Sequence, residues 1–126
     1  RIAMADGKFW LALDRLVATS NLVIDRPKGS PHPRYPSCRY PMDYGYLQGT
    51  RSPDGDGIDA WIGSLTDASV TGIIVTVDLD QRDAEFKLLL GCTAAEAQIA
   101  LAIHDRGSQA GKLVERHEPE RVPIHD

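Results

Sequence analysis

The chain has 126 residues, of which 42% are hydrophobic and 25% are charged, and its formal net charge is −4. These values are ordinary for one globular domain and leave no excess of basic residues for a nucleic-acid-binding surface. No apolar run approaches the roughly 20 residues that span a bilayer, and no signal peptide is recognisable. We therefore expect a single domain over residues 1–126, with neither nucleic-acid nor membrane partners.

The two cysteines, Cys38 and Cys92, lie in dissimilar contexts without the spacing of metal ligands. Reduced thiols and a cytoplasmic location are the interpretation that this pattern favours. Residues 1–3 precede Met4, and we expect them to be a remnant of expression, with Met4 as the natural start. Residues 117–126 are expected to form a loose tail.

The N-terminal third of the chain predicts one helix, one strand and one irregular segment. Asp6 is a helix N-cap candidate, Trp10 lies at the edge of the helix, and the apolar face comprises Phe9, Leu13, Leu16 and Val17. A short strand is expected over residues 22–25. Prolines are frequent from residue 27 onward and exclude regular structure over 26–39, which we interpret as a rigid wall.

The rest of the chain predicts four more strands and a second helix. The strands are expected over residues 59–62, 70–77, 85–90 and 112–114. Thr93 and Glu96 fit a capping box, and the helix should run to about Asp105 with Ile99 and Ile103 on its apolar face. The expected fold is mainly β (α+β): a small, five-stranded, OB-like closed β-barrel flanked by an N-terminal and a C-terminal helix.

Three carboxylates lie within six residues, at Asp54, Asp56 and Asp59. Carboxylates this close repel one another unless a cation lies between them, and hard oxygen ligands suit Mg²⁺ or Mn²⁺. The same segment is also an ordinary turn sequence, because Asp caps its own backbone and Gly accepts positive φ. The residues by themselves leave both interpretations open.

The flanking sequence resembles the soluble family I inorganic pyrophosphatases. The resemblance rests on Tyr40-Pro41-x-x-Tyr44-Gly45-Tyr46, then, eight residues on, Asp54-Gly55-Asp56, and Asp59 at the start of a strand; this spacing matches that of the family without a gap. Weaker similarity extends over residues 22–113. The resemblance implies hydrolysis of pyrophosphate to two phosphates by a metal-activated water, with Mg²⁺ as cofactor and Mn²⁺ as an alternative.

The resemblance also implies a role for individual residues. Its metal ligands would be Asp54, Asp59, Asp80, Glu85, which stands where the family has Asp, and Asp25, which stands where the family usually has Glu. Its catalytic residues would be Asp56, which helps to activate the water, Asp54 and Tyr44. Substrate would be bound by Tyr44, Lys87 and Arg34, the last replacing a lysine.

Several positions depart from the family pattern. Pro36 replaces a glutamate, Gly57 replaces a proline, and a hairpin that carries a phosphate-binding arginine is missing before Tyr40. Arg39 or Arg51 would have to supply the lost charge. His104-Asp105-Arg106 occupy the region where the family has a Tyr-Lys pair. The histidines share no spacing and are predicted to be surface or capping residues: His32, His104, His117 and His125.

We therefore expect a compact Mg²⁺-dependent pyrophosphatase that acts on the small molecule pyrophosphate. Two alternatives remain open: a hydrolase of another phosphoanhydride on the same fold, and a catalytically weak paralogue that binds metal or phosphate. A homo-oligomer is also expected, because the resemblance implies one and because Phe9 and Trp10 on the N-terminal helix could cover a neighbouring subunit. The alternative is that the same helix seals its own barrel.

Overall fold

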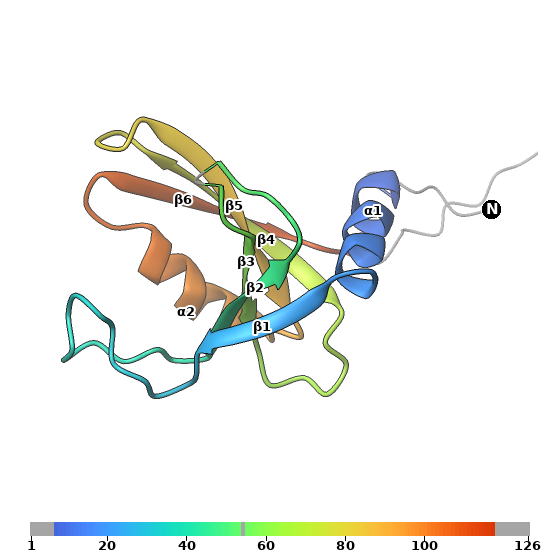
Figure 1. Ribbon diagram of the computed structural model, residues 1–126, viewed down its shortest axis with the longest axis horizontal. Helices are drawn as coiled ribbons and strands as arrows, with labels where there is room; N and C mark the ends of the chain where they lie inside the picture. The colour runs from blue at the N-terminus through green and yellow to red at the C-terminus, as the bar shows by residue number, and fades with distance from the viewer. Residues whose placement is uncertain (1–6, 54, 118–126) are drawn as a thin grey trace, which may run out of the picture.

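The computed structural model describes residues 7–53 and 55–117, and it contains two helices and six strands (Figure 1). In chain order these are α1 (Gly7–Ala18), β1 (Asn21–Arg26), β2 (Asp43–Gln48), β3 (Ile58–Ile62), β4 (Val70–Asp78), β5 (Asp83–Leu90), α2 (Ala94–His104) and β6 (Gln109–Glu115). Both predicted helices and all five predicted strands are present. Asp6, the expected N-cap, and most of the expected tail lie outside the described residues.

All six strands form one mixed sheet in the order β1-β2-β3-β5-β4-β6. Every neighbouring pair is antiparallel except β3 and β5, which are parallel. The expected five-stranded closed barrel is therefore wrong: β1 and β6 are the two edges of an open sheet. A barrel buries its inner face by closing on itself, whereas here each face is covered by a helix, so closure is not needed.

Strand β2 was not predicted, and it adds the sixth strand. It pairs with β1 on one side and with β3 on the other, so Tyr44 lies opposite Trp61. Gly45 lies between the two tyrosines of the motif and is a weak strand former by propensity. Glycine is needed here because the backbones of β1 and β2 approach closely. A Cβ at Gly45 would lie 1.9 Å from the carbonyl oxygen of Val23 on β1. The glycine of the motif thus allows β1 and β2 to pair.

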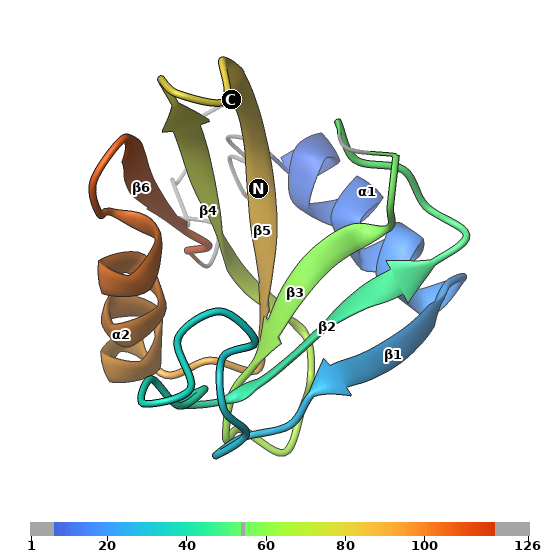
Figure 2. The ribbon, with the colours of Figure 1, turned by 60° about the vertical axis from the view of Figure 1, so that its left-hand side comes forward.

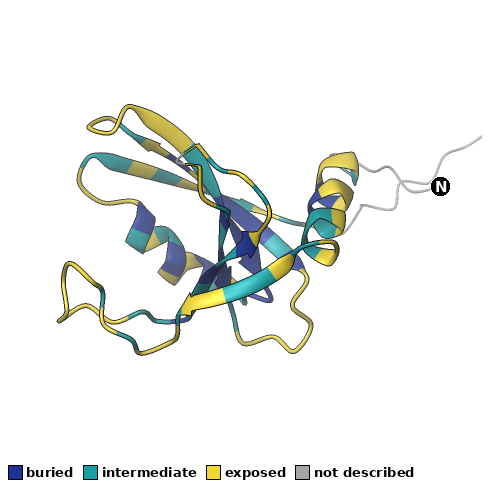
Figure 3. Cartoon of the chain, in the orientation of Figure 1, coloured by how far each residue is buried: buried dark blue, intermediate teal, exposed yellow. Residues whose placement is uncertain are grey.

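The two helices lie on opposite sides of the sheet (Figures 1 and 2). Trp10 and Leu13 of α1 are buried in a cluster that includes Leu47, Ile58, Ile73 and Leu88. Ala97 and Ala100 of α2 are buried in a second cluster with Met42, Trp61, Ile74 and Leu89. The buried residues concentrate where these clusters meet the sheet, and the loops are mostly exposed (Figure 3).

The helix faces differ in detail from the sequence prediction. Phe9 and Ile99, expected on the apolar faces, are 46% and 47% exposed. Trp10, expected at the helix edge, is buried in its own core, so it does not offer its ring to a neighbouring subunit. The homo-oligomer stays a prediction, with exposed Phe9 as the remaining part of the expected contact.

Side-chain hydrogen bonds hold both helices in place. The Thr93 hydroxyl and the Glu96 carboxylate form the predicted capping box of α2, and Glu96 also accepts the backbone N–H of Ser64 at 3.1 Å. The Arg116 guanidinium after β6 makes two bonds to the Asp14 carboxylate of α1, at 2.7 and 2.9 Å. These contacts attach each helix to the sheet in addition to its apolar packing.

Cys38 is exposed and Cys92 is buried, and both are free thiols. Within residues 7–53 and 55–117, neither helix has the length or the apolar character to cross a membrane.

Replacing Gly45 by Ala should destabilise the fold by about 3 kcal/mol, the upper end of the cost of overpacking, because the added Cβ meets backbone atoms of β1. Chemical denaturation of the two proteins measures the difference. Gly49→Ala is the matched control: its Cβ meets nothing within 4 Å, but its φ of +86° should cost only about 1 kcal/mol. Equal losses in both variants would show that close approach at Gly45 does not govern stability.

Candidate functional site

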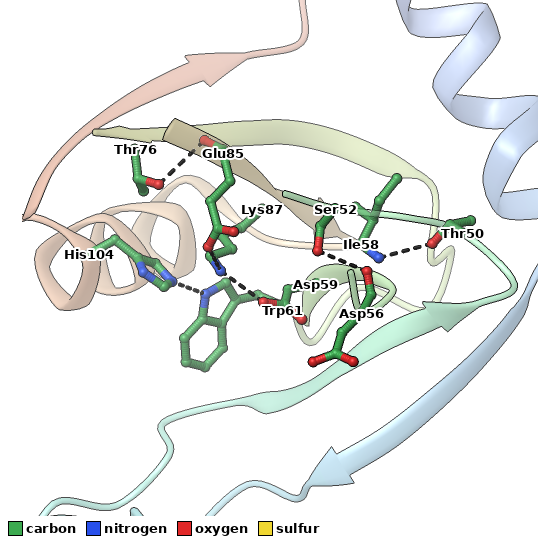
Figure 4. A network of polar contacts seen from close by, with 10 residues as sticks. All are labelled: Thr50, Ser52, Asp56, Ile58, Asp59, Trp61, Thr76, Glu85, Lys87 and His104. Carbon is green, nitrogen blue, oxygen red and sulfur yellow. Dashed lines mark hydrogen bonds and ion pairs between the residues drawn. The ribbon is translucent and has the colours of Figure 1, made fainter. Parts of the chain in front are cut away.

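A lysine lies between two carboxylates on the sheet face that α2 covers. The Lys87 ammonium of β5 bonds Asp59 Oδ2 of β3 at 2.8 Å and Glu85 Oε1 at 2.5 Å (Figure 4). The parallel register, with Ala60 opposite Leu88, sets Asp59 beside Lys87. Glu85 is two residues from Lys87 on the same strand and therefore shares its face. We call these three residues the acid–lysine–acid cluster.

Because Lys87 is buried, its pKa depends on its two carboxylate partners. The Lys87 side chain is 7% exposed, whereas those of Asp59 and Glu85 are 29% and 17% exposed. Burial of Lys87 opposes its charged form, but hydrogen bonds and attraction from Asp59 and Glu85 outweigh that effect and raise the pKa of Lys87. The lysine therefore stays protonated near neutral pH and acts as a cation and hydrogen-bond donor, rather than as a nucleophile.

Tyr44 extends the cluster from β2. Burial raises the pKa of Tyr44, and the charge of Asp59 and its hydrogen bond with Asp59 raise it further, followed by the charge of Glu85. The phenol therefore remains protonated and lies near the Asp59 carboxylate. The register of β2 on β3 places the ring of Tyr44 opposite Trp61, with the ring centroids 4.6 Å apart.

His104 at the end of α2 is buried, which corrects the prediction of a surface or capping residue. Its Nε2 accepts a hydrogen bond from the Trp61 indole N–H at 2.9 Å, so the neutral ring carries its proton on Nδ1. Burial, together with the charge of Lys87, lowers the pKa of His104 to about 4. The signal was present in the helical spacing, because His104 follows Ala97 and Ala100 on the buried face of α2.

Aromatic rings connect the cluster to the proline-rich segment. Tyr40 lies against both Tyr44 and Trp61, with ring centroids 5.8 and 5.9 Å apart. His32 stacks on Tyr40 at 5.9 Å with an interplanar angle of 8°, and Tyr35 lies 5.4 Å from His32. The segment is therefore held against the site, as the wall interpretation predicted, rather than serving as a linker.

The loop before β3 carries the other carboxylates of the motif. The Asp56 backbone carbonyl accepts bonds from the Ser52 backbone N–H and hydroxyl, both at 2.8 Å, and Ile58 N–H donates to the Thr50 hydroxyl (Figure 4). A Cβ at Gly57 would lie 2.4 Å from the Leu47 carbonyl oxygen. That crowding gives a physical reason for glycine at this position. Asp54 lies outside the described residues.

Three further predicted residues lie apart from the acid–lysine–acid cluster. Asp80 is in the β4–β5 turn, beyond the last strand pair, and its N–H donates to Asp78 Oδ1. Asp25 is exposed at a register shift of β1, an edge strand two positions from β3. Arg34 is exposed in the proline-rich segment, where its N–H donates to His32 Nδ1. The structure thus brings together Asp59, Glu85, Lys87 and Tyr44.

The acidic side chains of the site are the candidate ligands for the expected metal. Within the described ranges, no group of three or more His, Cys, Asp or Glu side chains could hold an ion. Two half-buried carboxylates, Asp59 and Glu85, converge on the Lys87 ammonium, each through one of its two oxygens. Mg²⁺ in proteins usually takes one or two carboxylates and keeps several waters, so the chemistry of this pair fits that cation.

The fold and the site define a small α+β domain with an acid–lysine–acid cluster on one face of an open mixed sheet. No protein-family model matches this chain, and no curated protein matches it. One solved structure with a similar chain path is an inorganic pyrophosphatase from Coxiella burnetii. It shares 16% sequence identity at a TM-score of 0.49, over 75% of this chain and 82% of that chain. A likeness at this level does not establish a family.

His104 makes stability depend on pH. The ordinary pKa of 6.5 applies in the unfolded chain and about 4 in the folded one, so the unfolded state binds more protons between these values. The stabilisation is complete above pH 6.5 and is lost as the pH falls toward 4, a change of roughly 3 kcal/mol. In His104→Gln, whose amide oxygen still accepts from Trp61, the unfolding free energy should fall less over this window.

Denaturant titrations at several pH values between 4 and 7 measure this difference, and His117→Gln, at an exposed histidine, is the control. Parallel pH profiles for wild type and His104→Gln would contradict the assignment.

Proposed function

We propose that this chain hydrolyses a phosphoanhydride bond, with inorganic pyrophosphate as substrate and Mg²⁺, or alternatively Mn²⁺, as cofactor. The observation that carries the proposal is the convergence of Asp59, Glu85, Lys87 and Tyr44 from three strands onto one point. The same residues occupy motif positions that resemble family I pyrophosphatases. Such a reaction requires cations to neutralise oxygen charge, a carboxylate to orient water and donors for the phosphoryl oxygens.

Asp59 and Glu85 are the residues that we propose hold the cation. Both are half-buried, and each bonds Lys87 through one of its two oxygens, so the second oxygen of each would hold the cation. A bound Mg²⁺ would neutralise phosphoryl oxygen charge and lower the pKa of a coordinated water. We further propose Asp54, Asp80 and Asp25 as additional ligands from the motif, and Asp56 as the carboxylate that accepts a proton from the attacking water.

Lys87, Tyr44 and Arg34 are the proposed donors to substrate. The Lys87 ammonium has three N–H donors, and its bonds to Asp59 and Glu85 leave one for a phosphoryl oxygen. Tyr44 stays protonated and can donate its hydroxyl hydrogen to a phosphoryl oxygen. Arg34 is exposed on the segment whose aromatic rings reach Tyr44. These donors would stabilise charge on the leaving phosphate.

A second candidate is a catalytically weak protein that binds phosphate or metal. One observation favours it: the two converging carboxylates of the described residues are already paired with Lys87. In such a protein the cluster would hold a metal ion, and phosphate through that ion, without turnover. Hydrolysis of a different phosphoanhydride is the third possibility, and the same assay separates the three.

Phosphate release from pyrophosphate should require Mg²⁺ or Mn²⁺ and should stop when the ion is chelated. Asp59→Asn should lower the rate at least about a hundredfold, because metal and water activation typically contribute several kcal/mol. Asp67→Asn, at an exposed carboxylate in the β3–β4 loop, is the control and should match wild type. Nucleoside triphosphates serve as alternative substrates. Pyrophosphate binding without phosphate release would favour the second candidate.

Lys87→Ala should weaken substrate binding about ten- to a hundredfold, since a charge-assisted hydrogen bond typically contributes ~1.5–3 kcal/mol. The loss should be large here because the arginine-bearing hairpin of the family is missing. Thermal unfolding of Lys87→Ala and of Lys87→Met, which retains the apolar stem, checks that the fold persists. Unchanged KM and kcat in both folded variants would exclude Lys87 from the site.

A further inference from the structure

We infer that His104 is a positioning residue for the proposed reaction: through the Trp61 indole it sets the place of the Tyr44 phenol near Asp59. This inference rests on the proposed function, in which Tyr44 donates to a phosphoryl oxygen, and adds a residue to that site. Two contacts carry it, the hydrogen bond from the Trp61 N–H to His104 Nε2 and the packing of Trp61 on Tyr44. We call His104, Trp61 and Tyr44 the positioning triad.

Strand register alone does not bring Tyr44 next to Asp59. Across β2 and β3, Tyr44 is paired with Trp61, whereas Asp59 is paired with Tyr46. Tyr44 and Asp59 are therefore diagonal neighbours, which only a long side chain that leans across the strands can connect. The Tyr44 phenol does lie near the Asp59 carboxylate, so the direction in which its ring leans determines the geometry of the site.

The Trp61 ring sets that direction. It packs edge-on against the Tyr44 ring, with centroids 4.6 Å apart and an interplanar angle of 63°, an arrangement that aromatic pairs favour. The Trp61 side chain is almost completely buried, and Tyr40 also packs on it, with centroids 5.9 Å apart. A rotation of the indole would therefore move the Tyr44 ring with it.

His104 fixes the orientation of the indole. The torsion that turns a Trp ring about its Cβ has broad minima, so contacts must select its value. Here the bond of 2.9 Å between Trp61 on β3 and His104 on α2 supplies the selection (Figure 4). A buried donor without a partner is costly. Without His104 the indole would turn toward another acceptor, and Asp59 lies on the same face of β3.

Kinetics of phosphate release from pyrophosphate in MgCl₂ test the positioning triad. His104→Leu, which cannot accept the indole bond, should lower kcat about tenfold with KM within about twofold, because a displaced donor acts mainly on the transition state. His104→Gln, whose amide oxygen takes the place of Nε2, should restore kcat. The control Asp14→Ala removes the bonds from Arg116 on the α1 side and should match wild type in kcat.

A double-mutant cycle distinguishes an effect through Trp61 from a direct effect of His104. Trp61→Phe keeps a ring but lacks the N–H, so His104→Leu in that background should lower kcat no further. A further loss of about tenfold would overturn the inference. Thermal unfolding checks that every variant is folded. If His104→Leu does not fold, Trp61→Phe by itself tests the same hydrogen bond, and an unchanged kcat would overturn the inference.

Nuclear Overhauser contacts between the ring protons of Trp61 and Tyr44 provide a readout that does not depend on activity. They should be the same in wild type and His104→Gln and should change in His104→Leu. Unchanged contacts in folded His104→Leu, or a loss of kcat that His104→Gln shares, would overturn the inference. Absence of phosphate release from wild type would overturn the proposed function instead, and the ring contacts would then decide whether His104 positions Tyr44.

Discussion

The parallel pairing of β3 with β5 joins two antiparallel units, β1-β2-β3 and β5-β4-β6, into one sheet. That pairing sets Asp59 beside Lys87, although 28 residues separate them in the chain. The same strand pair forms the centre of the sheet, where four side chains are almost completely buried: Ala60, Trp61, Leu88 and Leu89. A change in this register by one residue would turn Asp59 into the core on the α1 side. The site and the core therefore depend on the same strand pair.

Burying charge at this strand pair has a physical cost that its neighbours offset. Removing an ammonium and two carboxylates from water is unfavourable unless they pair and their hydrogen bonds are satisfied. Lys87 meets this requirement with Asp59 and Glu85, and the protonated Tyr44 phenol lies near Asp59. The resulting cluster has one positive and two negative groups, and a divalent cation is one way in which such an excess of negative charge is balanced. The electrostatics of the fold and of the proposed chemistry thus have the same origin.

Aromatic packing fixes the surroundings of the cluster. Trp61 contacts Tyr40 and Tyr44 through its ring and His104 through its indole N–H. Because His104 is neutral and buried, it satisfies the indole donor without placing a second cation near Lys87. The proline-rich segment reaches this group through His32 and Tyr40. A loop without helix or strand is therefore held at the site by ring contacts and backbone bonds.

Local patterns in the sequence predicted both helices and five of the six strands, and the family resemblance predicted the residues that meet at the site. The apolar runs over 70–77 and 85–90 predicted β4 and β5, and the capping box predicted α2. The resemblance to family I pyrophosphatases singled out Asp59, Glu85, Lys87 and Tyr44, which the fold does bring together. The ligand roles of Asp54, Asp80 and Asp25 and the role of Asp56 stay predictions.

Only the tertiary structure decided what depends on contacts between distant segments. Strand β2 exists because β1 and β3 pair with it, and Gly45, unfavourable by local propensity, is required by the close approach of Val23. The sheet remains open because a helix covers each face, a balance that no local pattern records. His104 is buried because the small side chains of α2 bring that helix close to Trp61. Periodicity reports which face of an element is apolar, but the partner of that face is set by the packing of the whole chain.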